Sequence, residues 1–125
     1  MMDQLLLHLI GDYITQSDWM AKEKVKRNWA ALCHSTVYSI PFLLLTQSLL
    51  AIFTIWFSHF LIDRFRLARY VIFAKNWVSD RGLKWVDCSE TGYHKSMPDW
   101  LSFWLMIIAD NTLHLTINYL AIVYL

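Results

Sequence analysis

Apolar residues fall in four long runs along the chain, and polar stretches separate them. A helix needs roughly 17–25 predominantly apolar residues to cross the hydrocarbon core of a bilayer, and each run has about this length. In lipid the backbone must satisfy its own hydrogen bonds, so the runs indicate helices. We therefore predict an all-α fold, an integral membrane four-helix bundle that forms one transmembrane domain over residues 1–125, with spans at about 3–19, 29–45, 49–70 and 99–124.

The connections between the runs differ strongly in length. Residues 46–48 form a very short turn, so the second and third spans should pair as an antiparallel hairpin. The long polar stretch 75–98 holds Trp77 and Trp85 among basic residues, a mixture typical of the membrane interface. We expect a cytoplasmic loop or a short helix on the membrane surface there, and Pro98 then gives the start signal of the fourth span.

The composition argues against a water-soluble protein. Of the 125 residues, 57% are hydrophobic and only 17% are charged. A domain this small keeps a large share of its surface exposed, so it cannot hide that much apolar surface from water. The two cysteines, Cys33 in an apolar run and Cys88 in a polar stretch, are not expected to meet, which predicts free thiols.

The basic residues indicate how the helices are oriented. All 11 Lys and Arg lie between Lys22 and Arg27 or between Arg64 and Lys95, in the first and third connections. Basic connections stay in the cytoplasm, so both termini should face outward. Because topology already accounts for the basic residues, nucleic-acid binding is a poor explanation for them.

Four His and three Asp lie inside the apolar runs, where a charged group near the bilayer centre costs about 2.5 to more than 10 kcal/mol. Six of them form three His/Asp pairs spaced four residues apart, a spacing that puts both side chains on one face of a helix. Neutral imidazoles and carboxylates bind Zn, Mn or Fe, and such an ion would offset the cost of burial. We predict one or two divalent ions bound by His8, Asp12, His34, His59, Asp63, Asp110 and His114.

The depths of these residues favour one shared site. Measured from the expected cytoplasmic helix ends at ~1.5 Å per residue, they lie roughly 5 to 21 Å deep, most of them in the cytoplasmic half of the bilayer. Seven groups exceed the four ligands of a closed zinc site, so either two metal ions share them or some of them orient the ligands and one serves as a general base. The candidates for this catalytic role are Asp12, Asp63 and Asp110.

Other polar residues are expected to support the site. Gln16 and Asn118 each lie four residues beyond a proposed ligand and should hold it by hydrogen bonds. Arg66 lies three residues after a proposed ligand, on roughly the same helix face. Together with Arg69 and Lys24 it should bind the anionic head of a substrate.

The function that these residues favour is metal-dependent hydrolysis of a lipid or another phosphate-bearing substrate that reaches the site from the bilayer. A bound ion lowers the pKa of its water towards ~7 and polarises a phosphoryl or acyl oxygen. The simplest alternative is that the His and Asp residues form polar contacts between helices, which is the commoner role of a single intramembrane His such as His34.

Two further functions fit the same pattern. Intramembrane Asp and His residues can form a proton or divalent-ion path, although four spans are few for a path unless the protein forms a homo-oligomer. The protein could instead be a non-enzymatic membrane inhibitor, with the segment 75–97 as its contact surface.

The first segment, LLLHLIGDYITQSDWMAKEK, resembles a family of small multi-span membrane proteins of bacteria and phages. The family signature is a polar residue followed by D-x-x-x-Q-x-x-x-M-A-x-x-K, and the late DNTLH also matches the family. The chain is more distantly similar to bacterial inner-membrane proteins described as membrane-bound metal-dependent hydrolases, which share intramembrane HxxxD pairs. The resemblance implies a location in the bacterial inner membrane. It rests on Asp12, Gln16, Met20, Ala21, Lys24, His59 and Asp63.

Overall fold

The computed structural model describes residues 2–125, which form helices and turns without any strand. The predicted all-α fold is therefore confirmed. The chain divides into two compact units, one made of residues 2–65 with His114–Leu125 and the other of Arg66–Leu113. Whether residues 1–125 make up one transmembrane domain stays a prediction.

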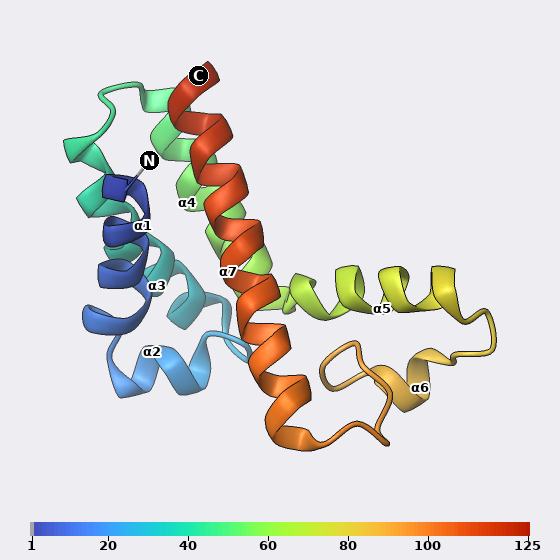
Figure 1. The fold of residues 1–125 in the computed structure, drawn as a ribbon. Helices are drawn as coiled ribbons and strands as arrows, with labels where there is room; N and C mark the ends of the chain where they lie inside the picture. Colours follow the sequence, from blue (N-terminus) through green and yellow to red (C-terminus); the bar gives the residue numbers. More distant parts are fainter. Residues whose placement is uncertain (1) are drawn as a thin grey trace. The chain divides into compact units, whose positions relative to one another are not determined.

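The first unit contains most of the helices, and Figure 1 shows α3 and α4 side by side. Its short α2 begins at the cap residue Ser17, whose hydroxyl accepts a hydrogen bond from Met20 N at 3.3 Å. Pro41 lies at the start of the 3₁₀-helix η2, where its missing N–H costs little. In chain order the unit has α1 (Met2–Leu9), the π-helix η1 (Ile10–Ile14), α2 (Asp18–Glu23), α3 (Asn28–Ser39), η2 (Ile40–Leu44), α4 (Leu49–Phe65) and the last part of α7 (Asp99–Tyr124).

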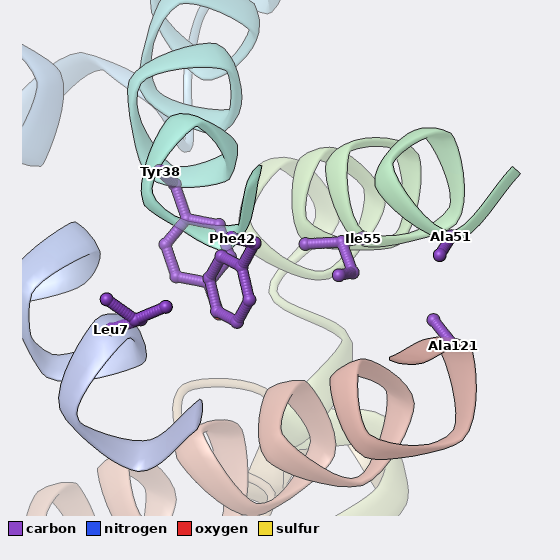
Figure 2. Close-up of a cluster of buried hydrophobic side chains, with 6 residues drawn as sticks. All are labelled: Leu7, Tyr38, Phe42, Ala51, Ile55 and Ala121. Atoms are coloured by element: carbon purple, nitrogen blue, oxygen red, sulfur yellow. The ribbon is translucent and has the colours of Figure 1, made fainter. Parts of the chain in front are cut away.

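The apolar core of this unit lies where α1, α3, η2, α4 and α7 meet. Figure 2 shows the rings of Tyr38 and Phe42 between Leu7 of α1 and Ile55 of α4. Ala51 of α4 and Ala121 of α7 are both buried and face each other. Their small side chains leave room for these helices to pack closely. The buried residues of the cluster are Leu7, Tyr38, Phe42, Ala51, Ile55 and Ala121.

The second unit contains α5 (Leu67–Ser79), α6 (Trp85–Cys88) and the first part of α7. Hydrogen bonds join α5 to the segment after α6, from Arg69 Nη1 to Ser89 O at 2.9 Å and from Asn76 Nδ2 to Gly92 O at 3.3 Å. The region 75–98, predicted as a loop or one short surface helix, thus includes the end of α5, α6 and a series of turns. Cys33 and Cys88 are free thiols.

Two of the predicted spans are interrupted. The segment 3–19 changes from α1 to the π-helix η1 and then breaks before α2. The segment 49–70 breaks at Arg66, which has the left-handed conformation φ 52°, ψ 51° between α4 and α5. This conformation cannot continue a right-handed helix. Arg66 therefore lies in the break between α4 and α5 and not within either helix.

One helix within residues 2–125, the 26-residue α7, is long and apolar enough to cross a membrane. The core helix of a soluble protein can have the same length and composition, so α7 alone does not establish a membrane span. Helix α4 has 17 residues and α3 has 12. The predicted four-span bundle is therefore not supported by helix length and composition.

Candidate metal centre

Three helices of the first unit bring four buried ligand side chains together. Asp12 comes from η1, His34 from α3, and His59 and Asp63 from α4. The two histidine residues are 0% exposed and the two aspartate residues 5%. A single π-turn such as η1 is frequent at functional sites because it redirects one side chain within a helix. The four-residue spacing of His59 and Asp63 places both on the same face of α4, as predicted.

The ligand atoms have the spacing of a coordination shell. One ligand atom from each of the four residues lies within 4.8 Å of all the others. The imidazole–imidazole and imidazole–carboxylate separations range from 3.0 to 3.7 Å. Metal bonds of about 2.0–2.1 Å at tetrahedral angles would place ligand atoms about 3.3–3.4 Å apart. The cluster could therefore hold one metal ion.

The carboxylate of Asp63 is unusual within this cluster. Its Oδ2 lies 3.1 Å from His34 Nε2 and 3.2 Å from His59 Nε2. It is buried without a hydrogen bond of acceptable geometry, and its closest partner is the ammonium group of Lys24, 2.8 Å away. This oxygen is therefore paired with a cation of the protein itself, at the point where a metal ion could bind.

His114 of α7 contacts the cluster from outside it. Its Nδ1 lies 3.1 Å from His59 Nδ1, and its Nε2 lies 3.3 Å from Asp63 Oδ1. If His59 Nε2 binds an ion, His59 Nδ1 carries the hydrogen and donates it to His114 Nδ1. His114 Nε2–H then points at Asp63 Oδ1 and leaves Oδ2 for the ion. This geometry makes His114 a support for two ligands more readily than a ligand itself.

His8 of α1 has a comparable position beside Asp12. Its Nε2 lies 3.8 Å from Asp12 Oδ2, and its Nδ1 lies 2.8 Å from the hydroxyl of Tyr38. The oxygen of Asp12 nearest to His34 is the other one, Oδ1, at 3.1 Å. Each carboxylate thus has one oxygen toward the cluster and one toward an outer imidazole.

Lys24, just after α2, is the most exposed member of the site. Its Nζ lies 2.8 Å from Asp63 Oδ2, 3.6 Å from Asp12 Oδ1 and 3.3 Å from His34 Nε2. Its side chain is 17% exposed, whereas those of the four cluster residues are at most 7% exposed. The ammonium group partly neutralises the two carboxylates and competes with a metal ion for the same oxygens.

Gly11 allows η1 to approach α3 beside the site. A Cβ atom at this position would lie 2.6 Å from Tyr38 Cδ2 and 3.3 Å from Tyr38 Cα. Only a residue without a side chain fits there. The close approach sets the position of the next residue, Asp12.

The remaining predicted residues have other surroundings. Gln16 Nε2 donates to the backbone carbonyl of Asp12 at 3.0 Å, not to its carboxylate. Asn118 Nδ2 donates to the hydroxyl of Tyr38 at 2.6 Å, not to His114. Their supporting role at the site stays a prediction.

The predicted residues of the second unit bind its own backbone or lie on α7. Arg66 Nη2 donates to Glu90 O at 2.9 Å, and Arg69 Nη1 donates to Ser89 O. Asp110 is half-buried on α7, one turn before the part of this helix that belongs to the first unit. Substrate binding by the two arginines and a catalytic or ligand role for Asp110 stay predictions.

Tyr38 is the site residue that the sequence reasoning missed. It is fully buried, and its ring stacks on His59 with the ring centroids 3.6 Å apart. It lies four residues after His34, the same spacing that identified the His/Asp pairs. Applying that spacing to every hydrogen-bonding side chain after a histidine would have found it.

Comparison with known proteins gives a family but no activity. No curated protein matches the chain, and no solved structure matches it. The resemblance to metal-dependent hydrolases therefore stays a prediction. The model of one family, described as "Protein of unknown function (DUF3307)", matches residues 1–125, and the chain belongs to this family.

Proposed function

We propose that this protein binds a divalent metal ion within the bacterial inner membrane and uses it to hydrolyse a lipid or another phosphate-bearing substrate. The observation that carries the proposal is the convergence of four buried ligand atoms at the spacing of one coordination shell. The ligands are Asp12, His34, His59 and Asp63. Two imidazoles with two carboxylates suit zinc, manganese or iron, and the carboxylates offset the charge of the ion.

The unequal spacing of the ligands suggests how the site acts. His34 Nε2, His59 Nε2 and Asp63 Oδ2 lie 3.0 to 3.2 Å from one another, whereas Asp12 Oδ1 is 3.7 Å from His59 Nε2. Three protein ligands with one exchangeable position are typical of catalytic zinc sites. We assign Asp12 to the exchangeable position. Asp12 would be the most weakly held of the four ligands, and its carboxylate would accept the proton of a water molecule that a bound ion acidifies.

Lys24 is the residue best placed to bind the substrate. A metal ion would displace its ammonium group from the carboxylates, and the chain of Lys24 is already partly exposed at the mouth of the site. A displaced ammonium group close to the ion binds phosphate oxygens as a point charge. A phosphoryl group would then lie between the ion and this lysine.

The distribution of side chains in the first unit supports a location in lipid. Its interior is rich in buried polar groups, while large apolar side chains such as Leu44, Leu49 and Ile14 are 77–86% exposed. Extended apolar surfaces on soluble monomers are rare, and ionisable residues in membrane proteins face the bundle interior. The buried polar residues include Gln4, His8, Asp12, His34, Ser35, Ser39, His59, Asp63, His114 and Asn118.

The two ends of the first unit agree with the predicted topology. Ser48, in the turn before α4, donates a hydrogen bond to Leu125 O at 2.9 Å. Asp3 and Leu45 line one small cavity together with Tyr119. Both termini and the turn therefore lie at the same end of the unit, as expected if they share the outer side of the membrane.

Elemental mass spectrometry of the full-length protein purified in detergent tests the metal site. We expect about one transition-metal ion per chain. His34→Ala and His59→Ala should remove it, because each deletes a ligand from a buried site. The control is His94→Ala, since His94 lies outside the cluster and bonds to Ser96. A metal content unaffected by both ligand substitutions would contradict the proposal.

Release of inorganic phosphate from a lipid phosphate monoester in mixed micelles tests the reaction. Asp12→Asn keeps an oxygen ligand of similar shape but cannot accept a proton. We expect it to bind zinc at saturating zinc and to lose phosphate release. Equal release by the wild-type and Asp12→Asn proteins would exclude Asp12 as the base.

A second function is favoured by the position of Lys24. Its contacts with Asp12, Asp63 and His34 could satisfy the buried charges without any metal, and such networks conduct protons in membrane transporters. Proton flux into proteoliposomes, lost in His34→Ala and seen in protein free of metal, would favour this function over hydrolysis.

A further inference from the structure

The side chains of Asn118, Tyr38 and His8 form a buried hydrogen-bonded chain that ends beside Asp12. The Tyr38 hydroxyl is 2.6 Å from Asn118 Nδ2 and 2.8 Å from His8 Nδ1. The other nitrogen of this imidazole, His8 Nε2, faces Asp12 Oδ2 at 3.8 Å. These side chains come from α7, α3, α1 and η1, and all four residues are at most 5% exposed.

The amide of Asn118 sets the direction of this chain. An amide nitrogen donates and does not accept, so the Tyr38 oxygen accepts from Asn118, and we assign the Tyr38 hydrogen to His8 Nδ1, 2.8 Å away. A neutral imidazole that accepts at Nδ1 carries its hydrogen on Nε2. His8 therefore directs an N–H dipole at Asp12 Oδ2, and its Nδ1 is already engaged by a hydroxyl.

We propose that Tyr38 is a positioning residue of the metal centre. It fixes His8 as the Nε2–H tautomer, and His8 holds the outer oxygen of Asp12 so that Oδ1 faces the ion. This inference rests on the proposed metal site. The arrangement parallels the other side of the centre, where His114 Nε2 contacts the outer oxygen of Asp63 at 3.3 Å.

The role removes His8 and His114 from the set of direct ligands. The His8 ring is hydrogen-bonded to the Tyr38 hydroxyl on one side and faces the Asp12 carboxylate on the other. The His114 ring contacts the imidazole of His59 and the carboxylate of Asp63. The four inner residues then bind a single ion, and the outer imidazoles determine which oxygen each carboxylate offers.

Zinc affinity of the Tyr38→Phe variant tests the role. Phenylalanine keeps the ring that stacks on His59 but lacks the hydroxyl, so it leaves the tautomer of His8 unspecified. Removing such an outer partner typically weakens metal binding 10–100-fold, and we expect a loss of this size in full-length protein titrated against a competing chelator in detergent.

Phe42→Leu is the matched control. Phe42 is fully buried with its ring centroid 5.3 Å from that of Tyr38, and it carries no polar group. This substitution should lower the thermal stability and leave zinc affinity unchanged. A purely structural role of Tyr38 predicts the same result for Tyr38→Phe, and equal zinc affinity of Tyr38→Phe and wild type would overturn the proposal.

A measurement on the wild-type protein keeps the test independent of the folding of variants. In protein labelled with ¹⁵N-histidine, the resonances of His8 are identified by their loss in His8→Gln. Their shifts should show a hydrogen on Nε2 and none on Nδ1. A hydrogen on Nδ1 of His8 would overturn the proposal.

The outcomes separate this inference from the proposed function. Wild-type protein that binds no zinc, manganese or iron overturns both. Wild-type protein that binds zinc, with Tyr38→Phe binding it as tightly, overturns only the positioning role. A selective loss in Tyr38→Phe together with the Nε2–H tautomer of His8 supports both.

Discussion

Each buried carboxylate of the site divides its two oxygens between an inner and an outer partner. Asp63 Oδ2 faces His34 and His59, and its Oδ1 faces His114. Asp12 shows the same division, with Oδ1 inward and Oδ2 toward His8. A carboxylate held at one oxygen has little freedom to rotate, so the other oxygen is preorganised for a cation.

Lys24 competes with any ion for these inner oxygens, because its Nζ lies 2.8 Å from Asp63 Oδ2. Replacing it with methionine, which has similar length and no charge, removes a positive charge from the site. Unit charges about 4 Å apart interact by ~4 kcal/mol at an effective dielectric constant of 20, although a lysine can swing away and reduce the effect. We expect Lys24→Met to raise zinc affinity about tenfold, measured by chelator competition.

Lys22→Met is the control for this prediction. Lys22 lies in α2, two residues before Lys24, and is exposed. Its replacement changes the net charge by the same amount but removes no ammonium group from the cluster. Zinc affinity that falls in Lys24→Met would show that the lysine assists the ion instead of competing with it.

The sequence predicted the members of the site better than their roles. Spacings of four residues identified three of the four inner residues and both outer imidazoles, because that spacing is fixed by helix geometry, whereas His34 was identified only as a histidine within an apolar run. The division into ligands and supports depends on which nitrogen or oxygen faces inward, and residue spacing carries no information about that. Tyr38 was missed because only His and Asp were paired.

At the level of elements, the π-helix η1 and Gly11 determine where Asp12 lies. The wider turn of η1 redirects Asp12, and the missing side chain of Gly11 lets this turn contact Tyr38. The contact between Gly11 and Tyr38 therefore fixes the positions of both Tyr38 and Asp12. A change in this turn should therefore affect packing and the site together.

Gly11→Ala tests this coupling. The added methyl group would overlap the Tyr38 ring and also approach its Cα, so rotation of the ring alone cannot relieve the overlap. Overpacking of this kind costs about 1–3 kcal/mol. We expect a lower free energy of unfolding in detergent and weaker zinc binding.

The control is Gly82→Ala, in an exposed turn of the second unit. An added methyl group there meets only the flexible side chain of Asp80 at 3.1 Å. Its unfolding and zinc affinity should match those of the wild type. Normal zinc affinity in a destabilised Gly11→Ala protein would show that η1 does not position Asp12.

The hydrophobic runs predicted the main helices but not the breaks between them. The runs at 29–45, 49–70 and 99–124 contain α3 with η2, α4, and α7, because packing stabilises long apolar helices. The break at Arg66 has no sequence signal, since neither glycine nor proline is present there. A left-handed arginine is adopted only because surrounding contacts such as Arg66 Nη2 to Glu90 O compensate for its strain.

At the scale of the molecule, the interior of the first unit combines an apolar cluster with many buried polar groups, and its exterior carries large apolar side chains. Such a unit is stable in lipid because the buried ionisable groups pair with one another while the exterior needs no water. The first segment of the unit, α1 with η1, is short for a membrane span. Together they cover residues 2–14, about 20 Å at ~1.5 Å per residue, which is less than the ~30 Å bilayer core.

Labelling of single cysteines in intact bacterial cells tests whether this short segment crosses the membrane. In a background of Cys33→Ser and Cys88→Ser, we expect a membrane-impermeant maleimide to label Asp3→Cys and Gln47→Cys in intact cells. Lys22→Cys should react only after lysis, because the basic first connection stays in the cytoplasm. Asp3→Cys and Gln47→Cys serve as mutual controls, since the N-terminus and the turn lie at one end of the unit. If both Lys22→Cys and Asp3→Cys are labelled in intact cells, the segment of α1 and η1 does not cross the membrane. Lys24 would then lie on the outer side and could not bind a substrate from the cytoplasmic leaflet.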